Sequence, residues 1–247
     1  DFLSVIINPN DDGQNGFEFA VQSTGNQLDA KISNKIFKLL VLSKLLNVYK
    51  EISDDFNDDI FSIHKTTFID GYFQSFKYFH DYRTEISNSL KIKTPLNPAN
   101  IAMINKIESK NSVCIHVRRG DYVNSNVASA VHGLCDMDYY KKGIEHLDTL
   151  DNNLHYFIFS DDIPWCKENF TALTEVTYVE INTTDEAHLD INLMTYCKYH
   201  IIANSSFSWW GAWLSDYKED SVIYPKEWFT SKGVNADDRF PKEWIAK

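Results

Sequence analysis

The chain has 247 residues, 43% of them hydrophobic, so it is long and apolar enough to fold into one large domain or two small ones, and wholesale disorder is excluded. Its formal net charge of −11 argues against nucleic acid or an anionic membrane surface as the main partner. The sequence contains no apolar run of about 18 residues and no visible signal peptide, which predicts a cytoplasmic protein without stable membrane insertion.

The first 110 residues are polar and irregular, with helical stretches. The expected elements here are an amphipathic helix over residues 36–52, a short strand running into a loop over residues 68–74, and a helix over residues 75–90. Pro95 and Pro98 then indicate a connection between two halves of the chain. We therefore expect one domain over residues 1–110 and a second over residues 111–247.

From residue 112 onward, strand patterns alternate regularly with helical ones. The expected strands are residues 112–117, 154–160, 176–181, 200–203 and 221–224. The expected helices are residues 138–147, a helix whose first turn carries Asp161, Asp162 and Pro164, residues 188–199, and a helix that begins near Ser205. This alternation predicts the α/β class, with a parallel sheet flanked by helices.

The four cysteines lie at positions 114, 135, 166 and 197. No two of them have C-x-x-C spacing, and no group of histidines and cysteines has the spacing of a zinc site. Cys114 and Cys197 lie in apolar segments, which indicates buried thiols. We therefore predict free cysteines in a reducing compartment.

Two adjacent arginines, Arg118 and Arg119, follow the expected strand at residues 112–117, where the backbone must turn. In open α/β sheets, ligands bind just beyond the carboxyl ends of the strands. The planar guanidinium of arginine is suited to bidentate contact with phosphate or carboxylate. The same spacing also fits a surface ion pair between Arg119 and Asp121, and the local pattern leaves both interpretations open.

A second cluster of polar residues, Asn204-Ser205-Ser206, stands between an apolar strand end and a helix. These residue types favour the N-cap position, and a helix N-terminus with nearby hydroxyl groups can bind an anion. Taken alone, the cluster is explained more simply by ordinary capping. Together with Arg118, however, the two strand–loop–helix turns could hold a pyrophosphate from opposite sides. Trp209 and Trp213 share a helical face, which favours core packing.

Three further acidic residues have a structural and a functional interpretation each. Asp161 and Asp162 could bind a metal ion, but a position in the first turn of a helix explains them more simply. Asp190 lies within an apolar helix and requires a partner there, either a ligand base edge or a backbone group. The sequence contains no P-loop, dinucleotide-binding or serine-hydrolase motif.

Four segments of the sequence carry a family resemblance. They are GYFQ at residues 71–74, HVRRGDYV at residues 116–123, IIANSSFSWWGA at residues 201–212 and YPKEWF at residues 224–229. Together they resemble the signature segments of the α-1,2-fucosyltransferases, glycosyltransferase family 11, in the form found in its bacterial branch. The family opens with a Gly-Gly-Leu-Gly-Asn-Gln loop that this chain lacks, so we expect about 30 to 40 further residues, a βαβ unit, ahead of it.

The resemblance implies a GT-B-like α/β fold with two Rossmann-like lobes, each a parallel sheet flanked by helices. Residues 1–110 would form the acceptor-side lobe, and residues 111–247 the lobe that binds the GDP-sugar. The implied reaction is inverting transfer of L-fucose from GDP-fucose to the 2-hydroxyl of a terminal galactose. The implied partners are GDP-fucose and a galactose-terminated glycan. Related fucosyltransferases work without a metal, so we expect no cofactor.

The resemblance also implies which residues contact the diphosphate. Arg118 would clamp the β-phosphate. Arg119 would contact phosphate as well or anchor its own loop. Asn204, Ser205 and Ser206, at the start of a helix, would hold the other phosphate oxygens.

The remaining implied roles are recognition of guanosine and removal of the proton from the acceptor hydroxyl. His116 and Asp190 match positions that recognise guanosine in related fucosyltransferases, and a carboxylate suits the N1–H and N2–H edge of guanine. Asp121 is the candidate general base, although a reaction with advanced leaving-group departure needs no strong base. The alternatives are a non-catalytic module that binds a GDP-sugar or carbohydrate, and a metal-dependent GT-A glycosyltransferase that uses Asp161 and Asp162.

Overall fold

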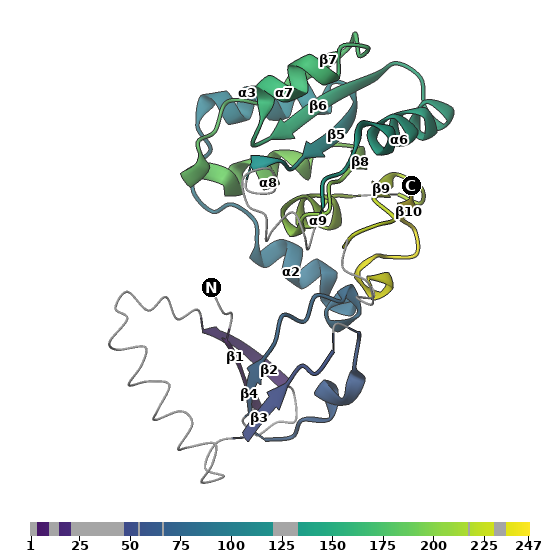
Figure 1. Cartoon of the computed structure of the whole chain (residues 1–247). Coiled ribbons are helices and arrows are strands. Elements are labelled where there is room, and N and C mark those ends of the chain that lie inside the picture. The colour runs from purple at the N-terminus through teal and green to yellow at the C-terminus, as the bar shows by residue number, and fades with distance from the viewer. Residues whose placement is uncertain are drawn as a thin grey trace. The chain divides into compact units, whose positions relative to one another are not determined.

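The structure is a computed structural model that describes residues 4–9, 15–20, 47–53, 55–65, 67–120, 133–216, 218–229 and 236–247. The chain forms two compact units, shown in Figure 1. The first unit comprises Asp1–His80 and Asn235–Arg239, and the second comprises Asp81–Val234 and Phe240–Lys247. Two compact units of this kind agree with the predicted two-lobed α/β, GT-B-like class.

The first unit contains a four-stranded sheet in the order β2-β1-β4-β3. Its strands are β1 (Ser4–Pro9), β2 (Asn15–Ala20), β3 (Asn47–Lys50) and β4 (Thr67–Asp70). Strand β1 pairs antiparallel with β2 and β4, and only β3 and β4 are parallel. The sheet thus differs from the wholly parallel one expected, because residues 10–14 are too short a connection to join two parallel strands.

The expected helix over residues 36–52 is wrong where the structure describes it. Residues Asn47–Lys50 form β3, which pairs in parallel with β4. A short apolar segment fits either a helix or a strand, and here pairing with β4 decides. Residues 36–46 lie outside the described residues. The expected strand at residues 68–74 is confirmed as β4 with a following loop.

The second unit is built around a six-stranded sheet in the order β10-β9-β8-β5-β6-β7, in which every strand pair is parallel. Its strands are β5 (Asn111–Val117), β6 (Leu154–Ser160), β7 (Val176–Tyr178), β8 (Tyr199–Ile201), β9 (Val222–Tyr224) and β10 (Ile245–Ala246). Its α-helices are α2 (Arg83–Ser89), α3 (Pro98–Glu108), α6 (Met137–Leu150), α7 (Ile163–Asn169), α8 (Ala187–Met194) and α9 (Ser206–Trp213). The predicted parallel sheet flanked by helices is therefore confirmed in this unit.

Short 3-10 helices complete the described elements. They are η1 (Asp58–Ser62), η2 (Phe76–Tyr78), η3 (His80–Tyr82), η4 (Thr184–Glu186) and η5 (Asp237–Arg239). The single helix expected over residues 75–90 is thus divided into η2, η3 and α2.

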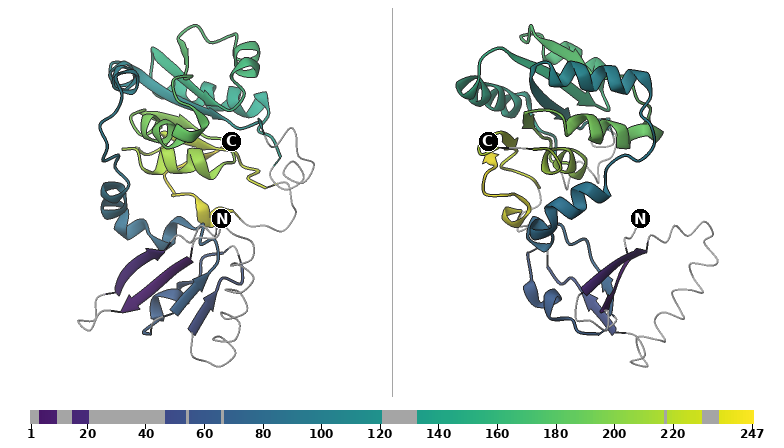
Figure 2. Two further views of the ribbon diagram at one scale, coloured as in Figure 1. Left: turned by 90° about the vertical axis from the view of Figure 1, so that its left-hand side faces the viewer. Right: turned by 180° about the vertical axis from the view of Figure 1, so that it is seen from behind.

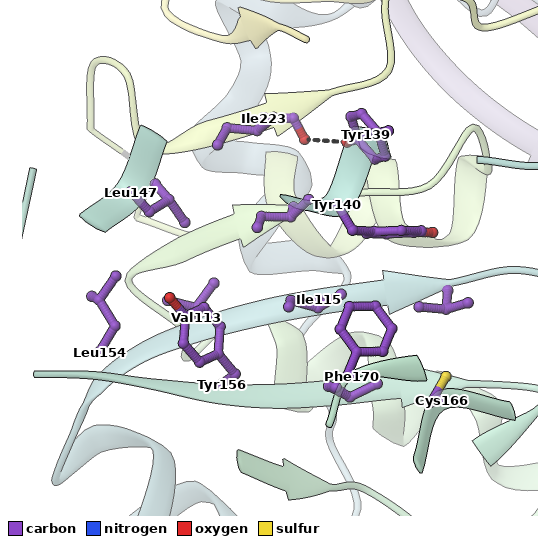
Figure 3. Packing of buried hydrophobic residues seen from close by; sticks show 13 residues of the cluster. Val113, Ile115, Tyr139, Tyr140, Leu147, Leu154, Tyr156, Cys166, Phe170 and Ile223 are labelled. Carbon is purple, nitrogen blue, oxygen red and sulfur yellow. Dashed lines mark hydrogen bonds between the residues drawn. The ribbon is translucent and has the colours of Figure 1, made fainter. Parts of the chain in front are cut away.

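Strand β5 is the centre of the second unit, because its side chains alternate between two hydrophobic clusters. Val113 and Ile115 pack against α6 and α7, as Figure 3 shows for Tyr140 and Cys166. Cys114 faces the opposite cluster, which includes residues of α3, α8 and α9. Helices accordingly cover both faces of the sheet (Figures 1 and 2).

The boundary between the compact units lies between His80 and Asp81, earlier than the expected boundary at residue 110. The physical reason is packing of the intervening helices on the second unit. Ile107 of α3 is fully buried in the same cluster as Cys114. From α2, the guanidinium of Arg83 donates hydrogen bonds to the carbonyl oxygens of Trp213 and Ser215.

All four cysteines are free, as predicted, and Cys114 and Cys197 are buried. Among the described helices, none combines the length and the hydrophobicity that a membrane crossing requires.

Close packing of α8 on α9 leads to a stability prediction. A Cβ atom on Gly211 would lie 2.8 Å from the Sδ atom of Met194 and 2.9 Å from its Cβ atom. Alanine within a helix normally stabilises it by about 1 kcal/mol relative to glycine. Here we expect Gly211→Ala to lower the free energy of unfolding in urea by about 1 to 3 kcal/mol. Asn105→Ala, at an exposed position of α3, should change it by less than about 0.5 kcal/mol. A more stable Gly211→Ala protein would contradict the packing described.

Candidate functional site

The candidate site lies at the edge of the second unit's sheet where three neighbouring parallel strands end. In the sheet register, Val117 of β5 is paired with Ser160 of β6, and Ile115 of β5 with Ile201 of β8. The residues that follow these strands are therefore brought to one edge, where ligands bind in open α/β sheets.

Asp161, directly after β6, organises the turn after β5. Its carboxylate accepts hydrogen bonds from the backbone N–H groups of Arg119, at 2.8 Å, and Gly120, at 3.0 Å. The Nη1 atom of Arg118 lies 2.9 Å from the Oδ2 atom of Asp161. A Cβ atom at position 120 would lie 2.8 Å from that same oxygen, which explains the glycine there. The Arg118 side chain is thus held in place at this edge while 35% of it stays exposed.

Arg119 is held by two residues at the start of α7, the helix that follows β6. Its Nε atom donates a hydrogen bond of 3.1 Å to Asp162, and its guanidinium lies 4.0 Å from the ring centre of Trp165. Asp162 is in turn the N-cap of α7 and accepts a hydrogen bond from the N–H of Trp165. The predicted role at the helix start is thus confirmed for Asp162 as the N-cap, whereas Asp161 lies before the helix and binds the turn after β5 instead. Asp121, the other expected partner of Arg119, lies outside the described residues.

The helix α9 begins at the same edge, after β8. Ser205 is its N-cap residue by backbone geometry, but the Ser205 side chain makes no capping hydrogen bond. Ser205 is half-buried, and Ser206 is exposed. Ordinary side-chain capping by Ser205, one of the two interpretations left open by the sequence, is therefore not what the structure shows.

The side chain of Asn204 is used within the protein. It is 3% exposed, and its Nδ2 atom donates hydrogen bonds of 3.4 Å to the carbonyl oxygens of Gly133 and Trp228. Its Oδ1 atom accepts a contact of 3.5 Å from the thiol of Cys135. Asn204 thus holds the turn into α9 in position.

The tryptophans of α9 belong to the core, as predicted. The rings of Trp209 and Trp213 are stacked at 5.8 Å with an interplanar angle of 13°, and both residues are buried.

His116 lies near the end of β5, where it is 5% exposed and 5.4 Å from the ring centre of Phe207 in α9. Burial, and then the positive charge of Arg118, lower the pKa of His116 to about 3. The imidazole is therefore neutral at pH 7. Its Nδ1 atom has no hydrogen-bond partner in the described part of the chain. A buried nitrogen of this kind is destabilising unless a water molecule or a ligand satisfies it.

Asp190 of α8 has a partner that the sequence did not indicate. Its Oδ1 atom accepts a hydrogen bond of 2.7 Å from the side-chain amide of Asn182. Burial raises the pKa of Asp190, the hydrogen bond from Asn182 lowers it, and the negative charge of Glu186 raises it.

The structure therefore brings together Arg118, Arg119 and the start of α9 by strand pairing. His116 lies near them on β5 and contacts α9 through Phe207. In the described part of the chain, no group of three or more histidine, cysteine, aspartate or glutamate residues is arranged to hold a metal ion.

The anchoring role of Asp161 leads to a second stability prediction. Asp161→Ala removes the acceptor of two backbone N–H groups and the ion-pair partner of Arg118. We expect the free energy of unfolding in urea to fall by about 1 to 2 kcal/mol, because these partly exposed groups regain water. Glu168→Ala, an exposed acidic position in α7, is the matched control and should leave stability unchanged. Equal stability of both variants would show that Asp161 does not anchor the turn.

Comparison with known proteins identifies the family of the chain. The sequence pattern of glycosyl transferase family 11 matches residues 26–247. An alpha-1,2-colitosyltransferase of Escherichia coli is 42% identical over 181 residues, which cover 71% of this chain and 60% of the relative. A galactoside 2-alpha-L-fucosyltransferase of Caenorhabditis elegans is 27% identical over 215 residues, 72% of this chain and 52% of the relative. The chain thus spans little more than half the length of these curated relatives.

Among solved structures, the NodZ alpha-1,6-fucosyltransferase soaked with GDP-fucose is similar, with a TM-score of 0.35 and 13% identity over 56% of this chain and 59% of that chain. This likeness is too low to support any assignment of residues. The match of the family pattern to most of the sequence, in contrast, is decisive: the chain belongs to glycosyl transferase family 11.

Proposed function

We propose that the protein transfers L-fucose from GDP-fucose to the 2-hydroxyl of a terminal galactose, with inversion and without a metal ion. The observation that carries this proposal is Arg118, which directly follows β5 and is anchored by Asp161 at the sheet edge, next to the strand β8 that leads into α9. The family and the names of the relatives support fucosyl transfer to a galactoside. Because those relatives are named as transferases, they favour an enzyme over a non-catalytic binding module.

In the proposed mechanism, the bond between the anomeric carbon of fucose and the β-phosphate oxygen breaks, and its electron pair leaves with GDP. The acceptor 2-hydroxyl oxygen forms the new bond from the opposite face of the sugar and loses its proton. Arg118 stabilises the negative charge that develops on the β-phosphate. The hydroxyls of Ser205 and Ser206 and the first N–H groups of α9 bind the other phosphate oxygens.

Arg119 and Asn204 were expected to contact phosphate, but in this proposal they support the phosphate-binding turns instead. Arg119 is engaged with Asp162 and Trp165, so it supports the turn that carries Arg118. Asn204 is buried and bonded to neighbouring loops, so it fixes the start of α9. Asp121, outside the described residues, stays the candidate general base.

The guanosine would be bound by His116 and Asp190. Neutral His116 presents a buried nitrogen that a nucleoside hydroxyl or amino group can satisfy. The carboxylate of Asp190 accepts hydrogen bonds only, which matches the N1–H and N2–H donors of guanine. These donor-binding residues belong to the second unit, and we assign the acceptor to the first.

Positive charge at the leaving group is supplied by Arg118, so a metal ion is not required. Asp161 and Asp162, the carboxylates that a metal-dependent GT-A enzyme would use, already accept hydrogen bonds from Arg119, Gly120 and Trp165. The free cysteines fit a reducing compartment, and we propose the cytoplasm.

A second candidate is transfer of colitose in the same α-1,2 linkage. The specific observation in its favour is the 42% identity to an alpha-1,2-colitosyltransferase. Assays of the chain with GDP-fucose and with GDP-colitose, each with lactose as acceptor, would distinguish the two donors.

Titration of the chain with GDP in a calorimeter tests the donor site directly. We expect GDP to bind, and to bind equally well with EDTA present, because arginine and α9 supply the positive potential. ADP is the control and should bind more weakly. Loss of GDP binding in EDTA would favour the metal-dependent alternative, and absence of GDP binding under both conditions would contradict the proposed donor site.

Replacement of Arg118 tests the phosphate clamp. We expect Arg118→Ala to lower the transfer rate by roughly 10²- to 10³-fold, the usual effect of removing one preorganised donor, with an unchanged circular dichroism spectrum. Arg118→Lys should be intermediate, because lysine keeps the charge and loses the planar guanidinium. Lys142→Ala, an exposed position of α6 with the same change in charge, should retain the wild-type rate. A wild-type rate in Arg118→Ala would remove the clamp from the mechanism.

A further inference from the structure

A chain of side-chain amides connects α3 to Asp190. Asn97 is the N-cap of α3 and accepts hydrogen bonds from the backbone N–H of Asn100, at 2.9 Å, and from its side-chain amide, at 3.1 Å. Asn100 and Asn182 form a reciprocal amide pair, with N–H···O distances of 2.7 and 3.1 Å. Asn182 then donates its bond of 2.7 Å to Asp190.

The carboxylate of Asp190, the last group in this series, fixes which group donates and which accepts in each hydrogen bond. An ionised carboxylate accepts hydrogen bonds only, so Asn182 must present its NH₂ group to Asp190. The carbonyl oxygen of Asn182 must then accept from Asn100, which is 1% exposed. Both N–H groups of Asn182 and its carbonyl oxygen are therefore used, and the amide has one orientation.

The location of Asn182 suggests more than a structural role. It lies between β7 and η4, on the segment that leads into α8. Fixing Asn100 and Asn182 in one rotamer costs side-chain entropy, yet the chain of bonds ends on a single half-buried carboxylate. Only one oxygen of Asp190, Oδ1, receives the bond. Its remaining acceptor positions can therefore be held in a defined plane for a ligand.

We propose that Asn182, itself held by Asn100, is a positioning residue that fixes the Asp190 carboxylate for bidentate recognition of the N1–H and N2–H edge of guanine. This inference rests on the proposed GDP-sugar donor. It assigns base selectivity to the amide pair between α3 and the β7–α8 connection, which does not itself touch the base.

Nucleotide selectivity tests the proposal, because inosine diphosphate lacks the N2 amino group of GDP and otherwise keeps its shape. Calorimetry with GDP and with inosine diphosphate would compare the wild type with Asn182→Ala, Asp190→Asn and the double variant. We expect Asn182→Ala to weaken GDP binding on the order of tenfold and to reduce the preference for GDP over inosine diphosphate. The double variant should be no worse than Asp190→Asn, because the two residues act as one unit.

Kinetics provide a readout that a general loss of structure would not reproduce. Asn182→Ala should raise the KM for GDP-fucose more than it lowers kcat at saturating donor. Asn105→Ala, on the exposed face of α3, is the matched control and should leave both affinities and kcat unchanged. Should Asn182→Ala fail to fold by circular dichroism, Asn182→Asp keeps the shape and replaces the donor by an acceptor, and it should weaken GDP binding further.

The outcomes separate this inference from the proposed function. Suppose that Asp190→Asn loses the preference for GDP. If the Asn182 variants then bind GDP and inosine diphosphate equally more weakly, or bind both as the wild type does, the positioning role of Asn182 is wrong. If Asp190→Asn binds GDP as the wild type does, the guanine assignment itself is wrong, and the positioning role is wrong with it.

Discussion

The candidate site depends on one constraint, the parallel pairing of β5 with a neighbour on each side. Because β6 and β8 run in the same direction as β5, all three strands deliver the residues that follow them to one edge of the sheet. Strand β5 is buried from Ser112 to Val117, so core packing on both faces fixes its register. The register in turn places Arg118 beside Asp161, and α9 begins one strand away.

Most elements of the second unit were predictable from the sequence because their signals are local, although α3 and β10 were not expected and the helix expected over residues 188–199 ends at Met194. The apolar segment of β6 and the aspartate and proline that start α7 lie within about ten consecutive residues, and the predicted strand bounds agree with the structure. For residues 47–50, in contrast, the local sequence does not decide the structure. Their residue types fit a helix or a strand, and only the partner β4, distant in the sequence, selects the strand.

At the site itself, the residue types were predictable but several partners were not. Arg118 and the serines before α9 lie in recognisable motifs. The spacing offered Asp121, which lies outside the described residues, as one possible partner of Arg119, and the structure pairs Arg119 with Asp162, 43 residues away. Asn100 and Asn182 are 82 residues apart, and no local pattern indicates that two polar side chains so distant will form a pair. Such contacts follow from the sheet order, which local sequence does not specify.

The ion pair between Arg118 and Asp161 also bears on the proposed binding of a phosphate by a protein with a net charge of −11. Charges farther away than a Debye length of about 8 to 10 Å are largely screened, so the distant acidic residues that make the net charge negative have little effect at Arg118. Both partners are partly exposed, at 35% and 25%, and such pairs contribute only about 0 to 1 kcal/mol. Exchange of the carboxylate for a phosphate therefore has a small cost. In the proposed exchange, Asp161 would keep its two backbone N–H donors, so the turn would stay in place while Arg118 contacts the phosphate.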